Sequence, residues 1–200
     1  LAGLLNTAGK QEAAIAKYQQ ALALYQTIPG TQEQQADCNK EIGVLLAHLG
    51  RAEQAEASCQ QAMSRYEEAL ALYQKTPGTE REQAACYLGV GAALQTMQKG
   101  AEAAARYQQA LQTYRSMEGT QEEQAMCHEH TAQALLLAGR GEEALANYDR
   151  AITAYKALKH TERRQAQCYE NAAGVLSGMA KYDEAIAKYQ QALGIYKTLP

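Results

Sequence analysis

Apolar and polar residues recur along this chain at a regular step of 41 residues. Three cysteines, four tyrosines and three threonines follow the step, each type at its own place in the repeated segment. The recurring residues are Cys86, Cys127 and Cys168; Tyr66, Tyr107, Tyr148 and Tyr189; and Thr79, Thr120 and Thr161. Self-similarity at a fixed period of this size is typical of stacked supersecondary units. The pattern therefore predicts a repeat array.

Each repeated segment has the pattern of two helices. In the third, Pro77–Gly78 is predicted to end the preceding helix, and Thr79 is predicted to be an N-cap. Glu82 stands three residues later, where it would complete a capping box. A first helix would run to about residue 97, and a second over 101–117. The same residue types recur as Thr31 with Gln34 and Thr120 with Glu123, whereas Arg164 stands at the box position after Thr161.

The second helices carry tyrosines in pairs that are seven residues apart. Seven residues make nearly two helical turns, so each pair lies on one face. An aromatic row could line a ligand site, but we interpret these rings as packing residues whose hydroxyl groups reach water or a partner. The pairs are Tyr18 and Tyr25, Tyr66 and Tyr73, Tyr107 and Tyr114, Tyr148 and Tyr155, and Tyr189 and Tyr196.

Composition supports a folded, mostly helical chain. Ala, Leu, Glu and Gln are strong helix formers, and 46% of the 200 residues are hydrophobic with a net charge of −3. Nineteen Lys and Arg against 22 Asp and Glu, without a basic run, argue against nucleic-acid or membrane partners. Five cysteines without a close CxxC pair favour a reducing, cytoplasmic compartment over a secreted disulfide framework.

Small and aromatic residues on the second helices resemble a known family. Gly139, Ala144, Tyr148 and Ala151 stand in the order G-x4-A-x3-Y-x2-A, which resembles the tetratricopeptide repeat. Similar sets are Gly50, Ala55, Cys59 and Ala62, and Tyr182, Ala185, Tyr189 and Ala192. The 41-residue length is similar to the longer repeats of kinesin light chain and spindle-orienting adaptors. The resemblance implies an all-α, right-handed superhelical solenoid of antiparallel helix pairs that binds proteins. Gln98 and Ala180 replace the family's glycine at the turn between paired helices.

The resemblance divides residues 1–200 into one array. It comprises a half repeat (1–30) and four repeats (31–78, 79–119, 120–160 and 161–200), and we expect it to be part of a longer array. Repeat 31–78 carries seven extra residues. They are predicted to lengthen its second helix, over 52–76, and to displace the following repeats along the helix axis. The alternative is a protruding tip.

No residue pattern predicts catalysis. Cys127 and His130 could share a helix face as metal ligands, but zinc needs more ligands than this pair supplies, and Cys127 fills the recurring cysteine position. The recurring cysteines are interpreted as small buried thiols rather than disulfides. GxSxG and GxxxxGK motifs are absent from the sequence. We therefore expect no enzyme activity, no metal and no cofactor; a metal protein centred on Cys127 and His130 is the least favoured alternative.

In the family, the first helix of each repeat lines a concave groove. The residues at those positions are called here the first-helix face. They are Asp37, Lys40, Val44 and His48; Leu88, Ala92 and Gln95; Met126, Glu129, His130, Gln133 and Leu136; and Gln167, Glu170, Asn171 and Gly174.

The residues of the first-helix face indicate which kind of ligand to expect. The family's carboxylate clamp is matched only at Lys40, and the asparagine that grips a peptide backbone in the longer-repeat adaptors is matched only at Asn171. Apolar positions mixed with Glu129 and Glu170 favour a peptide with apolar anchors and basic residues. Self-assembly through the ends of the array is the alternative function.

Overall fold

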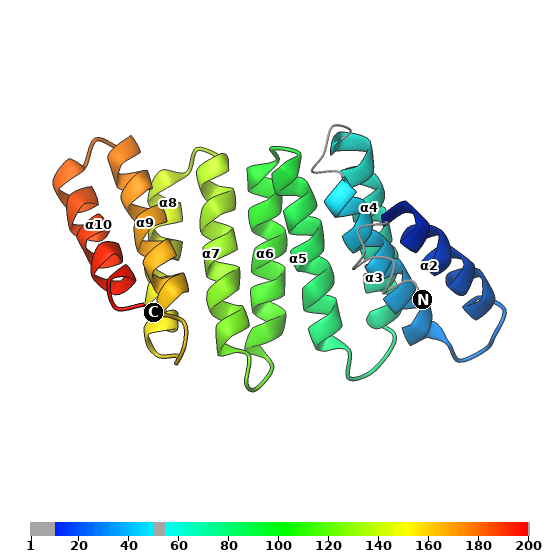
Figure 1. Ribbon diagram of the computed structural model, residues 1–200. Coiled ribbons are helices and arrows are strands. Elements are labelled where there is room, and N and C mark those ends of the chain that lie inside the picture. Colours follow the sequence, from blue (N-terminus) through cyan, green and yellow to red (C-terminus); the bar gives the residue numbers. More distant parts are fainter. Residues whose placement is uncertain (1–10, 50–54, 200) are drawn as a thin grey trace. The chain divides into compact units, whose positions relative to one another are not determined.

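The computed structural model describes residues 11–49 and 55–199 and contains only α-helices there. The chain divides into two compact units, Leu1–Gln98 and Lys99–Pro200. In the first unit, α2 (Gln11–Tyr25) packs against α3 (Gln32–Leu49), α3 against α4 (Ala55–Tyr73), and α4 against α5 (Glu80–Thr96). Consecutive helices run antiparallel (Figure 1). The predicted all-α fold of helix pairs is confirmed.

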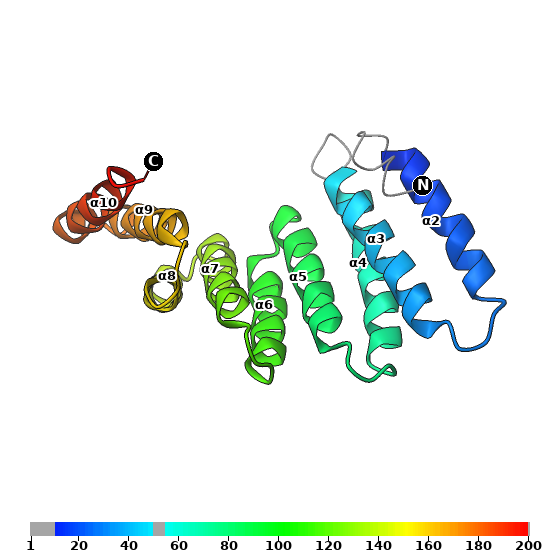
Figure 2. The same cartoon turned by 60° about the horizontal axis from the view of Figure 1, so that its bottom comes forward.

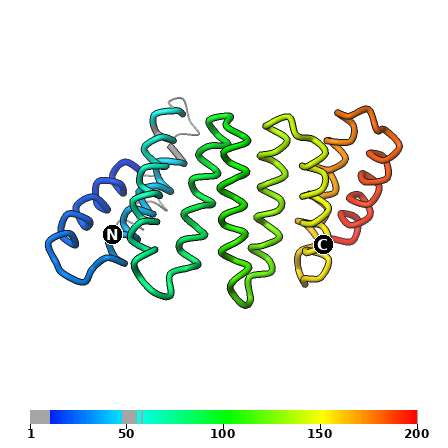
Figure 3. Tube along the Cα trace, turned by 180° about the vertical axis from the view of Figure 1, so that it is seen from behind, coloured from blue at the N-terminus to red at the C-terminus, as the bar shows by residue number. Residues whose placement is uncertain are grey.

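The second unit continues the same alternation. It contains α6 (Gly100–Arg115), α7 (Gln121–Leu137), α8 (Gly141–Lys156), α9 (Glu162–Gly178) and α10 (Tyr182–Tyr196). Each helix packs against the next one in sequence, and α9 and α10 lie side by side in both Figure 1 and Figure 2. Short connections join the helices (Figure 3).

The core is made of small residues and aromatic rings. Tyr73, Tyr148 and Tyr155 are at most 1% exposed, and all five cysteines are buried thiols outside any disulfide. The packing interpretation of these tyrosines and thiols is therefore confirmed. Tyr189 differs, with 44% of its surface exposed, because in the described chain no later helix covers it.

The threonine between consecutive repeats ties two helix ends together. Its hydroxyl donates to the carbonyl of the last tyrosine of the preceding helix, at 2.7 Å for Thr79 to Tyr73 and 2.6 Å for Thr120 to Tyr114. The carbonyls of a last helical turn have no partner within the helix. These buried hydroxyls supply one, so each junction is closed by hydrogen bonds rather than by water.

The capping-box prediction is wrong in its hydrogen bonds. Thr79, Thr120 and Thr161 occupy the N-cap position but form no side-chain cap hydrogen bond, because their hydroxyls face the previous helix. A glutamine four residues later completes the junction and donates to the same tyrosine carbonyl. These glutamines are Gln35, Gln83, Gln124 and Gln165, at 3.2, 3.4, 3.4 and 3.2 Å. Arg164 therefore does not weaken its junction, since Gln165 is present.

The turns keep a left-handed backbone even where glycine is replaced. Gln98 and Ala180 have φ of 60° and 59°, close to the 73° of Gly139 at the equivalent turn. His160 likewise has φ of 63° where Gly78 and Gly119 stand in other repeats. A side chain in this conformation costs about 1 kcal/mol. The fold therefore fixes the turn geometry, and the residue adapts to it.

The extra residues of repeat 31–78 lengthen its second helix in part. Helix α4 has 19 residues, whereas α6 and α8 have 16 each. The described part of α4, Ala55–Tyr73, ends three residues before the predicted end at 76, and the predicted start at 52 lies outside the described residues. The displacement of the following repeats stays a prediction.

Candidate functional site

The first-helix face of the second unit lies on α7 and α9. Leu136, Gln167, Glu170 and Gly174 are exposed on it. Met126, His130, Gln133 and Asn171 are half-buried there. Glu129 is the exception, because only 9% of it is exposed. The predicted positions therefore form a mostly accessible surface with one buried carboxylate.

Polar side chains on α9 are linked to one another. The amide of Gln167 donates to Glu170 at 3.5 Å and to Asn171 at 3.3 Å. The Tyr196 hydroxyl, from α10, donates to Glu170 at 3.1 Å. One turn further along, Gly174 leaves room for a side chain, since an added Cβ would find only the Tyr189 hydroxyl within 4 Å, at 3.9 Å. An ordered row of polar groups thus borders an unfilled place on the helix.

Arg164 connects the two first helices of this unit. Its guanidinium lies 3.7 Å from Glu129 and 4.0 Å from Glu122, both on α7. It also donates to the Tyr155 hydroxyl at 3.3 Å, and that hydroxyl donates to Glu129 at 3.0 Å. The carboxylate of Glu129 is therefore held by a cation and a phenol. Sequence reasoning missed this group because Arg164 was visible only as a departure from the capping box.

The first unit repeats the tyrosine–acid pair with another acid. Tyr73 donates to Asp37 at 2.5 Å, and Lys40 lies 3.4 Å from the same carboxylate. Val44 is half-buried beside them, and the side chain of His48 lies outside the described residues. Leu88, Ala92 and Gln95 on α5 are half-buried.

Titratable groups near this face are shifted mainly by burial. Burial raises the pKa of the Cys86 thiol to about 12, although the nearby Lys40 ammonium lowers it. Burial also raises the pKa of Cys168, and the Glu129 carboxylate adds to the rise. These thiols are poor nucleophiles at neutral pH, because the thiolate is the reactive form.

The segment Cys127–His130 does not converge on one point. Cys127 is fully buried, and burial raises its pKa to about 12. The His128 ring lies 3.2 Å from the Asn147 side chain on α8, whereas the His130 ring stacks on Tyr107 with centroids 5.2 Å apart. Burial lowers the pKa of both histidines. Within residues 11–49 and 55–199, no group of three potential metal ligands occurs.

Among the described residues, no helix combines the length and the apolar character needed to cross a bilayer.

Comparison with known proteins identifies the repeat. A tetratricopeptide repeat model matches residues 124–198, and a second model of the same repeat matches 41–76 and 83–123. No curated protein matches the sequence.

Solved structures share the fold at low sequence identity. BtubC (BKLC) from P. vanneervenii matches with a TM-score of 0.84 at 20% identity, over 98% of this chain and 77% of that one. A kinesin light chain-like protein with nearly identical repeats from Podospora anserina matches with a TM-score of 0.78 at 18% identity, over 98% and 92%.

A third structure is a peptide complex. The Rap conjugation gene regulator of plasmid pLS20, solved with the Phr* peptide, matches with a TM-score of 0.64 at 19% identity. The match covers 98% of this chain and 51% of the regulator, so this chain spans about half of that protein. Together with the family models over most of the sequence, these matches show that the chain belongs to the tetratricopeptide repeat family.

Proposed function

We propose that this chain is a non-catalytic scaffold or adaptor that binds a peptide or protein segment along its first-helix face. The observation that supports this most is the ordered polar row on α9 beside the bare Gly174. Amide side chains can both donate to and accept from an extended peptide backbone. Because Gln167 and Asn171 are already linked, less side-chain entropy is lost when a ligand binds.

The charges and apolar positions suggest the kind of segment. Glu170 and Asp37 are exposed carboxylates, whereas Glu129 is already paired with Arg164. Leu136 offers an apolar contact and is 46% exposed. An extended segment that places apolar side chains near Leu136 and a basic side chain near Glu170 would suit this surface. The proposal includes neither nucleic acid nor membrane as a partner, and it places the chain in a cytoplasmic, reducing compartment that suits cysteines outside any disulfide.

The test is a peptide-display selection against the whole chain, followed by affinity measurements with one enriched synthetic peptide. Gly174→Arg should weaken binding at least tenfold, because its long side chain would occupy the place beside Asn171. Gly174→Ala is the matched control. It should bind the peptide normally and fold at least as well, since alanine favours helix more than glycine does.

A second pair of variants tests the charge. Glu170→Lys should weaken the binding of a basic peptide. Glu184→Lys makes the same change at an exposed position on α10 and should leave the affinity unchanged. Equal affinity of the native chain, Gly174→Arg and Glu170→Lys would reject the first-helix face as the binding surface. Glu129 is unsuitable for this purpose, because its replacement would remove the buried carboxylate that pairs with Arg164.

A second candidate function, self-association, is favoured by an exposed apolar row on α10. Tyr182, Ile186, Tyr189 and Leu193 are 62, 53, 44 and 52% exposed. One repeat earlier, Tyr148 and Ile152 occupy the positions of Tyr189 and Leu193 and are 1% and 4% exposed. The helix that carries them, α8, packs against α9, so α10 presents the kind of face that α8 buries.

Sedimentation over a wide concentration range separates the two candidates. Self-association through α10 predicts a rising mass that Ile186→Glu and Leu193→Glu together abolish, with peptide binding unaffected. A native chain that stays monomeric at the highest concentration would rule out self-association and leave the peptide proposal in place.

A further inference from the structure

A concave region lies on the side of α7 opposite to the first-helix face. It is an open pocket of about 720 Å³, called here the outer pocket. Its lining includes Gln124 and His128 from α7, and Arg150, Ala154, Ala157 and Leu158 from α8 and the turn after it.

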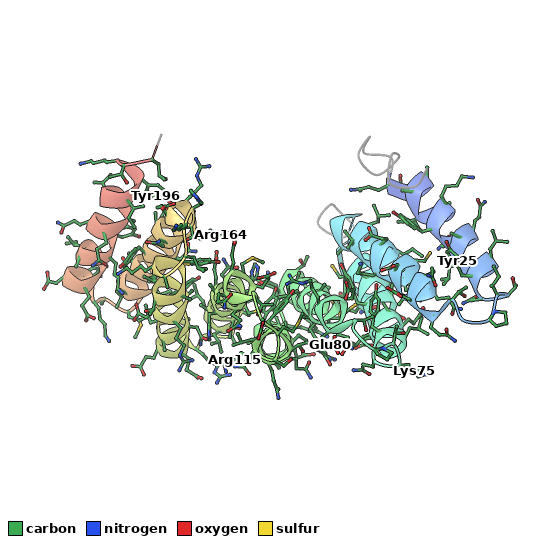
Figure 4. The ribbon with its side chains drawn as sticks, turned by 90° about the horizontal axis from the view of Figure 1, so that it is seen from below. Tyr25, Lys75, Glu80, Arg115, Arg164 and Tyr196 are labelled. Atoms are coloured by element: carbon green, nitrogen blue, oxygen red, sulfur yellow. The ribbon has the colours of Figure 1, made fainter. Side chains whose placement is uncertain are left out.

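Helix geometry separates this pocket from the first-helix face. His128 and His130 are two residues apart, which rotates their side chains by about 200° around the helix axis. His130 stacks on Tyr107, while His128 lines the outer pocket. In Figure 4, Arg115 and Arg164 lie on opposite sides of the second unit. Arg164 contacts Glu129 of the first-helix face, and Arg115 acts electrostatically on His128. The two surfaces are therefore distinct.

The pocket combines an apolar wall with positive charge. Ala154, Ala157 and Leu158 supply aliphatic surface, and Arg150 also lines the pocket. Arg115, at the end of α6, and Arg150 both act on the His128 ring. No ion pair of either arginine is found among the described residues.

The acid in the pocket lining is already compensated. Asp149 pairs with Lys188 of α10 at 2.5 Å. Arg150 therefore supplies a positive charge beside the apolar wall, and Arg115 adds to the positive potential at His128. A pocket of several hundred Å³ with mostly apolar walls and a few polar groups is the usual form of a small-molecule site.

We propose that the outer pocket binds a small amphipathic carboxylate, with its apolar chain on Ala154 and Leu158 and its anionic head at Arg150. The apolar chain would gain from leaving water. Arg150 would bind the head group through planar, forked hydrogen bonds, and Arg115 would add a weaker long-range attraction. This inference does not depend on the proposed peptide binding, because it uses a different face and different residues.

Calorimetry of the whole chain with three amphiphiles of one chain length tests the proposal. The probes are decanoate, 1-decanol and decylammonium, each below its aggregation concentration. Decanoate should bind with one molecule per chain and at least tenfold more tightly than decylammonium. Equal affinity for the three probes would overturn the proposal, because the arginines would then contribute nothing.

Variants locate the site. Arg150→Gln should weaken decanoate binding about threefold, the effect of one exposed ion pair, and Arg115→Gln should weaken it less. Arg163→Gln removes the same charge from an exposed position on α9 and should have no effect. Ala154→Phe should abolish binding by filling the pocket, and Ala157→Phe does the same from an exposed position if the first variant folds poorly. Unchanged decanoate affinity in both arginine variants would refute the site.

The exposed apolar row on α10 is the competing place for an alkyl chain. Ile186→Glu therefore serves as a further control and should leave decanoate affinity unchanged. Binding that survives Ala154→Phe but is lost in Ile186→Glu would place the ligand on α10 and overturn the proposal. Nuclear magnetic resonance of the His128 ring gives an independent readout. Its pKa is lowered by burial and by the two arginines, so a bound carboxylate should raise it.

Discussion

Two tyrosines at equivalent places in the repeat have opposite charge arrangements around them. Tyr155 donates to the buried Glu129, and Arg164 from the next first helix contacts both groups. Around Tyr73, the position of Glu129 is taken by Lys40, and the position of Arg164 is taken by Glu82.

Both of the exchanged charges act on the Tyr73 side chain. The ammonium group of Lys40 lies 6.0 Å from the centre of the Tyr73 ring, and Glu82 acts electrostatically on its hydroxyl. An extra acid, Asp37, accepts the hydroxyl's hydrogen bond. The repeat therefore conserves the buried phenol and its hydrogen bond while the signs of the surrounding charges are free to exchange. At both of these tyrosines a cation and an acid meet, although different helices supply them.

Exchanging the charges in the second unit is the strongest test of this view. Glu129→Lys would place a buried ammonium beside Arg164 instead of the buried carboxylate that pairs with it, and should cost about 3 kcal/mol of unfolding free energy. Adding Arg164→Glu recreates the order found in the first unit and should recover more than half of the loss. Urea unfolding followed by circular dichroism measures the cycle. Additive losses in the double variant would show that the two charges do not interact.

Removing the phenol hydroxyl compares the two acids directly. Tyr155→Phe leaves the buried Glu129 with one partner fewer and should cost about 2 kcal/mol. Tyr73→Phe should cost about 1 kcal/mol, because the Asp37 side chain is 51% exposed and water can replace the lost donor. The same unfolding measurement applies. Equal losses would mean that the burial of the acid does not decide the strength of the pair.

The helices and their pairing could be predicted because they depend on short-range patterns. The 41-residue step, the tyrosine pairs and the helix-forming composition all survive in the sequence without knowledge of tertiary contacts. The prediction placed the threonine at each junction correctly at the start of a helix. It expected the hydroxyl to cap that helix, whereas the hydroxyl donates to the end of the preceding helix. The direction depends on the end of the previous helix, whose carbonyl at Tyr73 or Tyr114 lies close only after folding.

The tyrosine–acid sites were harder to see for a related reason. Arg164 contacts Glu129 across 35 positions of sequence, and no local motif marks that pair. The charge swap becomes visible only when Lys40 is aligned with Glu129 through the seven extra residues of repeat 31–78. One signal was available: the acid precedes its tyrosine by 26 residues both for Glu129 with Tyr155 and for Glu170 with Tyr196.

The buried cysteines beside the two tyrosines extend the comparison to pH. Burial raises the pKa of Cys86 to about 12, above the value of about 8.5 for a free thiol. The unfolded chain therefore loses this proton first, so the thiol's stabilising contribution is complete below pH 8.5 and is lost as pH rises toward 12. The unfolding free energy should fall by about 1.4 kcal/mol per pH unit for each such thiol.

Cysteine variants test that slope between about pH 8.5 and 9.5, where free tyrosine, with a pKa of about 10, is still mostly protonated. Cys86→Ala and Cys168→Ala should each flatten it by up to one proton. Lys40 lowers the pKa of Cys86 whereas Glu129 raises that of Cys168, but Lys40→Met should leave the slope in this window unchanged, because the folded Cys86 thiol is already protonated throughout it. A slope that neither cysteine variant changes would show that both thiols are protonated alike in the folded and unfolded chain.

The smallest effect concerns the ion pair that is present in the first unit but absent from the second. Lys40 lies 3.4 Å from Asp37, and their side chains are 24% and 51% exposed. At this exposure the coupling should be about 0.5 kcal/mol and should nearly disappear in 1 M salt. A double-mutant cycle of Asp37→Asn and Lys40→Met at low and high salt measures it, and the Glu129–Arg164 cycle under the same conditions should lose a smaller fraction of its coupling because Glu129 is buried. If salt weakened both cycles by the same fraction, the two tyrosine sites would be equally hydrated, and burial of Glu129 could not explain why one site relies on an arginine and the other on a lysine.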